Sequence, residues 1–296
     1  RQEGLLRTKR NSSPTNPLPE AFYNRLVEAF RSYMLVGGMP EAVATYTETG
    51  SYRYSSDIVN EIIQGYQDDF AKYGAKANPL LLRQTLISVA HQAGAKFVYS
   101  RVEGQYRSAE VKVALEMLKD AGLIIPTYHT DANGVPLGAE INERVVKYLI
   151  HDTGVLLGIL GIDDDIDERI KEMMVADSID LVDKGHVAEM MAGLELIKYS
   201  SPQTRHQLYY WQNMNKGTCA EVDYVIARSG SIVPIEVKSG VKGSMSSMYS
   251  LMRNPQKHIE MGIRCSLENF GTFASPDGKK IDIIPLYAIS NLFAEK

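Results

Sequence analysis

The stretch Val233-Pro-Ile-Glu-Val-Lys-Ser-Gly240 decides the fold of this chain. Side chains alternate between the two faces of a β-strand, so its valines and isoleucine face one way while Glu236 and Lys238 face the other. The pattern predicts a core strand that carries a carboxylate and an ammonium group on one face.

The preceding stretch, Ala220-Glu-Val-Asp-Tyr-Val-Ile226, alternates in the same way and places Asp223 on the side away from the core. A hairpin turn around Arg228-Ser-Gly230 would set Asp223 beside Glu236 on the neighbouring strand. Adjacent carboxylates repel each other, and a hard divalent cation relieves that repulsion. We therefore predict that Asp223 and Glu236 bind Mg²⁺, with Mn²⁺ as an alternative.

Two further residues complete the predicted site. Lys238 would orient a metal-activated water or stabilise charge in phosphodiester hydrolysis. Glu189, in the helical stretch Lys184-Gly-His-Val-Ala-Glu189, is expected to be an outer ligand or to position that water.

The C-terminal part, residues 185–296, is predicted to be one domain of the order αβββαβ with one added strand. The expected elements are a helix over 185–199, strands over 207–212, 220–227 and 232–239, a helix over 245–261, and strands over 264–268 and 281–288. The strongly acidic segment before it, residues 161–184, is predicted to be a solvated linker.

The N-terminal half is predicted to be helical. Apolar residues recur at three- and four-residue steps from Pro19 to Tyr73, with a break at Gly37-Gly-Met-Pro40, which gives a helical region over residues 1–78. Residues 79–160 read as two helices and a β-hairpin whose turn lies at Asp131–Gly134, the order of a winged helix-turn-helix. The fold class predicted for the whole chain is α+β or α/β.

Composition excludes several classes of protein. The net charge of −4 gives no general attraction to nucleic acid, and two widely spaced cysteines fit a reducing, cytoplasmic compartment. No apolar run reaches the roughly 18 residues that a membrane helix requires. A polar opening at Arg1, in place of a methionine, suggests a cut inside a longer chain.

The ordered series Glu189, Asp223 and Glu236-Val-Lys238 resembles the PD-(D/E)XK nuclease superfamily, whose equivalent positions bind metal and activate water. Further motifs resemble the region downstream of the AAA-type ATPase module in bacterial and archaeal ATP-binding proteins; they are Gly37-Gly-Met-Pro-Glu41, Tyr148-Leu-Ile-His-Asp-Thr-Gly154, Lys184-Gly-His186, Leu208-Tyr-Tyr-Trp211, Ala220-Glu-Val-Asp-Tyr224 and Pro234-Ile-Glu-Val-Lys-Ser-Gly240. The resemblance covers Tyr33 to the C-terminus. It implies a restriction-endonuclease-like fold and an ATPase module in cis, upstream of this chain. A Gly-x-x-x-x-Gly-Lys-Ser/Thr phosphate loop occurs nowhere in the sequence, so no ATP site of that type is expected in this chain.

Two hypotheses of different classes remain open. The first is a Mg²⁺-dependent deoxyribonuclease. The second is a non-catalytic DNA- or protein-binding module that regulates the ATPase, in which Lys238 merely neutralises Glu236 on a polar face of the sheet. The winged helix has the same two alternatives, DNA binding or docking of a protein partner, because the basic and acidic residues between Leu80 and Thr130 nearly balance.

Overall fold

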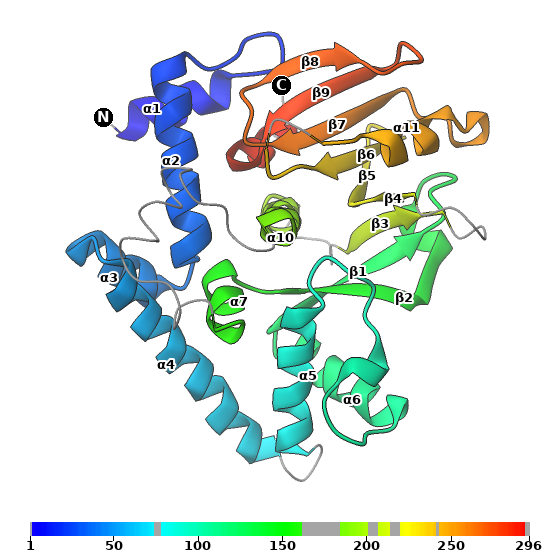
Figure 1. Cartoon of the computed structure of the whole chain (residues 1–296). Coiled ribbons are helices and arrows are strands. Elements are labelled where there is room, and N and C mark those ends of the chain that lie inside the picture. Colours follow the sequence, from blue (N-terminus) through cyan, green and yellow to red (C-terminus); the bar gives the residue numbers. More distant parts are fainter. Residues whose placement is uncertain are drawn as a thin grey trace. The chain divides into compact units, whose positions relative to one another are not determined.

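The computed structural model describes residues 2–73, 78–161, 184–200, 207–213, 220–240 and 243–293 (Figure 1). The chain forms two compact units that do not follow the chain order. Unit 1 comprises residues 1–27, 127–146 and 184–296, and unit 2 comprises residues 28–126 and 147–183. The predicted acidic linker lies almost wholly outside the described residues. The α+β class predicted from the sequence is confirmed.

Helices dominate unit 2, and local signals set their ends. They are α2 (Glu20–Val36) from residue 28 onward, α3 (Pro40–Thr49), α4 (Tyr52–Phe70), α5 (Pro79–His91), α6 (Ser108–Asp120) and α7 (Thr153–Ile159). The predicted break at Gly37–Pro40 is present: Gly37 takes φ +77°, and Pro40 opens α3 at a position where a missing N–H costs nothing. Ser51 caps α4 by accepting a hydrogen bond from the Tyr54 N–H.

A single carboxylate joins two motifs of unit 2. The Asp152 carboxylate accepts the Val155 N–H at the start of α7, at 3.0 Å, and the Gly38 N–H, at 2.6 Å. A Cβ added to Gly37 would lie 2.3 Å from Asp152 Oδ1, so this approach requires glycine. Asp152 therefore ties the glycine pair before α3 to the start of α7.

The predicted hairpin is present after α6. Gly122, with φ +76°, ends α6, and β1 (Ile124–Thr130) and β2 (Ile141–Ile150) are hydrogen-bonded neighbours in a sheet. The connection is longer than the predicted turn at Asp131–Gly134, because the 3₁₀ helix η3 (Leu137–Glu140) completes it. Packing of α5 on α6 is apolar and well buried; Leu82, Leu86, Val111, Leu115 and Leu118 are at most 3% exposed.

Unit 1 is built on a five-stranded sheet of order β5-β6-β7-β9-β8 (Figure 1). Its strands are β5 (Tyr224–Arg228), β6 (Ser231–Val237), β7 (Met261–Ser266), β8 (Gly271–Ala274) and β9 (Lys280–Pro285). The predicted β5–β6 hairpin forms, with Ser229 and Gly230 both at positive φ in its two-residue turn. β6 pairs in parallel with β7, and β7 pairs in parallel with β9.

Unit 1 also contains the helices α10 (Lys184–Lys198) and α11 (Ser246–Arg253) and the strand β3 (Leu208–Gln212). In chain order α10, β3, the β4–β5 strand, β6, α11 and β7 form the expected αβββαβ series. The structure differs from the prediction in three places. The second helix is shorter than 245–261, and an additional strand, β8, follows β7. The last predicted strand, 281–288, is present as β9 but ends at Pro285, where the 3₁₀ helix η5 (Leu286–Leu292) begins.

The strand predicted over Ala220–Ala227 is interrupted at Asp223. β4 (Glu221–Val222) pairs antiparallel with β3, in a second sheet of order β2-β1-β3-β4, whereas β5 pairs with β6 in the first sheet. Within unit 1, β1 pairs in parallel with β3. Asp223 therefore marks the point where the chain passes from one sheet to the other.

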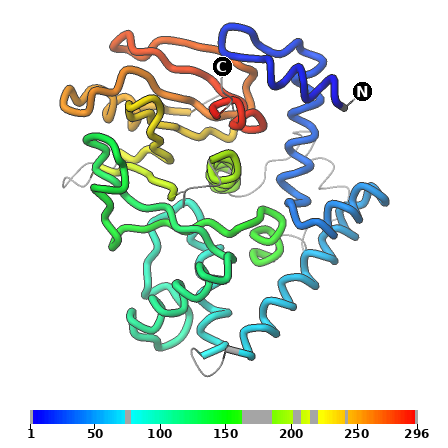
Figure 2. Tube along the Cα trace, turned by 180° about the vertical axis from the view of Figure 1, so that it is seen from behind, coloured from blue at the N-terminus to red at the C-terminus, as the bar shows by residue number. Residues whose placement is uncertain are grey.

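The N-terminal residues pack on the C-terminal part of unit 1, which the sequence prediction did not anticipate. α1 (Gln2–Asn11) lies beside η5 in both views (Figures 1 and 2). The buried Lys9 ammonium donates to the Tyr287 carbonyl, at 3.2 Å, and to Ser290 Oγ, at 3.0 Å. The Asn291 amide donates to the carbonyl of Lys9. No helix among the described residues is long and apolar enough to cross a membrane.

Candidate active site

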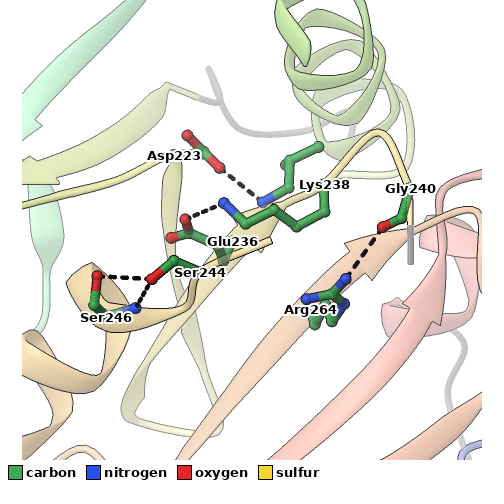
Figure 3. A network of polar contacts seen from close by, with 8 residues as sticks. Asp223, Glu236, Lys238, Gly240, Ser244, Ser246 and Arg264 are labelled. Carbon is green, nitrogen blue, oxygen red and sulfur yellow. Dashed lines mark hydrogen bonds and ion pairs between the residues drawn. The ribbon is translucent and has the colours of Figure 1, made fainter. Parts of the chain in front are cut away.

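Three of the four predicted site residues meet at one end of β6 (Figure 3). Glu236 lies near the end of β6 and Lys238 follows the last residue of that strand. Asp223 reaches them from the β4–β5 junction, because the Val237 N–H donates to Asp223 Oδ2 at 2.7 Å. The predicted neighbourhood of Asp223 and Glu236 on adjacent strands is therefore present.

The interruption at Asp223 explains how its carboxylate is positioned. In a regular strand the Val237 N–H would face a main-chain carbonyl of the neighbouring strand. Here the Asp223 side chain accepts that hydrogen bond, so the carboxylate completes the ladder between the two strands. Its second oxygen, Oδ1, does not share this bond.

Glu236 occupies the most unusual environment in the cluster. Its side chain is 8% exposed, and Lys238 Nζ donates to its Oε1 at 2.6 Å. The other oxygen, Oε2, is buried and has no hydrogen-bond partner among the described residues. Burial, followed by the negative charge of Asp223, raises the pKa of Glu236 from 4.5 to about 7, although Lys238 acts in the opposite direction.

Glu189 lies on the helix that packs against β6 and β3. Its backbone is fixed by the buried Tyr224 hydroxyl, which donates to the Glu189 carbonyl oxygen at 2.8 Å. Burial, and then the charges of Glu189 and Asp223, raise the pKa of Tyr224 well above its ordinary value. Among the residues that the structure describes, no three His, Cys, Asp or Glu side chains gather in a group able to hold a metal ion. The role of Glu189 as an outer ligand or water-positioning group stays a prediction.

Two residues beside the site were not predicted from the sequence. Arg264 and Cys265 on β7 lie in register with Glu236 and Val237. Arg264 is only 5% exposed. A single charged residue inside the otherwise small and apolar stretch Gly262-Ile-Arg-Cys-Ser266 was the available signal, since buried arginines are rare unless paired. Burial and the charge of Asp223 raise the pKa of the Cys265 thiol to about 12, so this cysteine is inert as a nucleophile.

The donors present fit a hard divalent cation. Mg²⁺ is held in many phosphate-processing sites by one or two carboxylates, with water and substrate oxygens completing the octahedron. Asp223 and Glu236 supply two carboxylates, and the buried Glu236 Oε2 without a partner is an oxygen that a cation would satisfy. Binding of a cation would also favour the ionised form of Glu236 that burial and Asp223 disfavour.

Two regions of the chain match known protein families. Residues 27–166 match a domain of unknown function (DUF8612), and residues 184–289 match another domain of unknown function (DUF4143). The second match contains all four predicted site residues. Comparison with curated proteins and with solved structures found no match.

Proposed function

We propose that residues 185–296 carry a Mg²⁺-dependent nuclease that hydrolyses phosphodiester bonds in DNA. The observation that supports this most directly is the state of Glu236. Its carboxylate is buried beside Asp223, one of its oxygens has no partner among the described residues, and its pKa is raised to about 7. A carboxylate pair held in this way is typical of a site that gains stability from a cation.

Asp223, Glu236 and Lys238 each have a part in the proposed reaction. Asp223 and Glu236 would hold the metal ion, which supplies Lewis-acid polarisation of the phosphodiester and acidifies a bound water. Lys238, 21% exposed and 2.6 Å from Glu236, can turn from that carboxylate towards a substrate phosphate or the attacking water. Its ammonium would then stabilise the negative charge that develops on the phosphorane-like transition state.

We further propose that this chain is the C-terminal part of an AAA-type ATP-binding protein, with its ATPase module in cis. The motif resemblance and the match of residues 184–289 to DUF4143 support this assignment. Under it, α5, α6 and the β1–β2 hairpin form the proposed winged helix. DNA is its proposed partner, with a protein partner as the alternative.

A second candidate function is favoured by the ion pair between Lys238 and Glu236. If that pair is permanent, the carboxylate has its counter-charge within the chain, and the domain would be a non-catalytic DNA- or protein-binding regulator of the ATPase. The near balance of charge on α6 suits a protein partner better than a phosphate backbone, because its two lysines are offset by acidic residues; these are Lys112 and Lys119 against Glu110, Glu116 and Asp120.

The deciding experiment is a cleavage assay with the full-length protein, using Mg²⁺ or Mn²⁺ and single- and double-stranded DNA and RNA. Asp223→Asn and Lys238→Ala are the test variants. Asp277→Asn is the matched control, because Asp277 is an acidic residue of the same unit whose ion pair with Arg253 is exposed. We expect metal-dependent cleavage of DNA that falls by about a hundredfold in the test variants and is unchanged in the control. Absence of cleavage on every substrate, with a destabilised Lys238→Ala protein, would favour the regulatory function.

A further inference from the structure

We propose that Arg264 is a positioning residue that holds the segment Lys238–Gly240 in place and connects it, through the loop Leu267–Asn269, to the N-terminal residues around Leu18. For its catalytic consequence this proposal rests on the nuclease function proposed above. Its structural content stands independently, since it concerns hydrogen bonds within unit 1.

Arg264 is a buried charge with defined partners. Its Nε donates to Glu268 Oε2 at 2.6 Å. Its Nη2 donates to the Gly240 carbonyl at 3.1 Å, the bond drawn in Figure 3. Burying a guanidinium is costly unless it is paired and hydrogen-bonded. Its planar set of donors can bind two acceptors in fixed directions at once, which a lysine ammonium on a flexible stem does less well.

The segment that Arg264 holds carries the candidate catalytic lysine. At its beginning the Lys238 N–H donates to the Cys265 carbonyl at 2.8 Å, and at its end Gly240 accepts from Arg264. Both anchors therefore come from β7. Without the second anchor, Gly240 would lose its hydrogen bond to β7, and the ammonium group of Lys238 would lose its defined direction towards Glu236.

The partner of Arg264 belongs to a short loop that is itself tied down. Glu268 Oε2 also accepts from Ser266 Oγ at 2.9 Å. The neighbouring Asn269 makes a reciprocal pair with the backbone of Leu18: its Oδ1 accepts the Leu18 N–H at 3.1 Å and its Nδ2 donates to the Leu18 carbonyl at 2.8 Å.

A second bond joins the same two segments, because the Tyr23 hydroxyl donates to the Leu267 carbonyl at 2.9 Å. A displacement of the N-terminal residues would thus move the loop that carries Glu268, and with it the bond between Arg264 and Gly240. The structure offers a physical route by which a partner or module acting on the N-terminal residues could control Lys238.

A contiguous set of contacts demonstrates coupling only when perturbation at one end is measured at the other. The test is hydrogen–deuterium exchange of the full chain, read in peptides that span Lys238–Gly240, for Arg264→Lys, Asn269→Ala and the double variant. Arg253→Lys is the matched control, because Arg253 Nε also donates to a carboxylate at 2.6 Å, but in an exposed pair with Asp277.

We expect exchange at Lys238–Gly240 to rise at least about tenfold in Arg264→Lys and by a smaller factor in Asn269→Ala, with the control unchanged. The double variant should exchange little faster than Arg264→Lys alone, because both changes release the same anchor. Unchanged exchange in Arg264→Lys would overturn the positioning role, and fully additive effects in the double variant would overturn the connection to Leu18.

Activity gives an independent readout. In the cleavage assay, Arg264→Lys should lower kcat by about ten- to a hundredfold with KM nearly unchanged, as loss of a supporting residue does. If Arg264→Lys does not fold, Glu268→Gln takes its place, since the amide keeps an acceptor for Arg264 and removes only the charge. If the wild type cleaves nothing, the proposed nuclease function fails, while the exchange measurement still decides the role of Arg264.

Discussion

Replacing Glu236 with glutamine should remove a large part of the pH dependence of stability of unit 1. The pKa of Glu236 is raised from 4.5 to about 7 in the folded protein. Between these two values the folded state holds a proton that the unfolded state has already lost. The contribution of Glu236 to stability is therefore fully present below pH 4.5 and is lost as the pH rises to 7.

The size of the effect follows from the shift. Each pKa unit corresponds to about 1.4 kcal/mol, so a shift from 4.5 to about 7 gives a loss of about 3 kcal/mol between pH 4.5 and pH 8. Glutamine cannot ionise but keeps an oxygen that accepts from Lys238. The free energy of unfolding of Glu236→Gln, taken relative to that of the wild type, should therefore increase by about 3 kcal/mol between pH 4.5 and pH 8.

The only tryptophan makes the measurement specific. Trp211 lies in β3 of unit 1 and is buried, so its fluorescence during urea unfolding follows that unit. Unfolding curves of both proteins at pH 5, 6, 7 and 8, without metal, give the difference directly. Parallel pH profiles for the two proteins would show that Glu236 does not titrate near 7, and would refute the argument.

The same unfolding curves, measured with added Mg²⁺, test whether Glu236 binds the cation. At pH 8, Mg²⁺ at ten times its dissociation constant should stabilise the wild type by about 1.4 kcal/mol through mass action. At pH 5 the protonated Glu236 should bind it far less, and Glu236→Gln should respond weakly at either pH. Equal stabilisation of both proteins would place the cation elsewhere.

Three further predictions concern single substitutions. Lys238→Ala should lower the cleavage rate by about a hundredfold, and an unchanged rate would contradict the proposed role of Lys238. At pH 8 without metal the same change should also lower the melting temperature, and Mg²⁺ should restore part of that decrease. Asp152→Ala should destabilise unit 2 by about 2 kcal/mol, measured by circular dichroism, because it removes a helix cap from Val155 and the acceptor of the Gly38 N–H. Gly37→Ala should lower the free energy of unfolding by about 1–3 kcal/mol, because Gly37 has a positive φ and an Asp152 oxygen lies close to it. The decrease should be smaller in the Asp152→Ala background, and equal decreases in both backgrounds would rule out a clash with Asp152.

The predictions that succeeded rest on short-range patterns. Alternation in Val233–Gly240 placed Glu236 and Lys238 correctly, and the turn at Ser229–Gly230 brought Asp223 beside them. These features depend on residues a few positions apart, where the period of the strand and the turn chemistry leave few alternatives. The helix ends at Gly37 and Gly122 were predictable for the same reason.

The predictions that failed depend on distant residues. Nothing in the polar stretch Gln2–Asn11 indicates that Lys9 would be buried against Tyr287, 278 positions later. The break between β4 and β5 lies at Asp223, whose side chain accepts a hydrogen bond from β6. The local alternation of residues does not reveal this contact and therefore predicted one continuous strand. The strand predicted over 281–288 ends early, at Pro285, because the apolar residues after it form η5 and pack against α10.

The composition of unit 1 from three separated stretches has a consequence for the synthesis of the protein. At roughly 5–20 residues per second, a ribosome needs about 14 to 56 s to add the 278 residues that separate Lys9 from Tyr287. During that time the N-terminal segment lacks hydrogen-bond partners that it has in the finished structure, which are Tyr287 and Ser290 for Lys9 and Asn269 for the backbone of Leu18. Unit 2 can fold in this interval, so the nascent chain holds a folded unit flanked by an unpaired N-terminal segment, a state that a chaperone would bind.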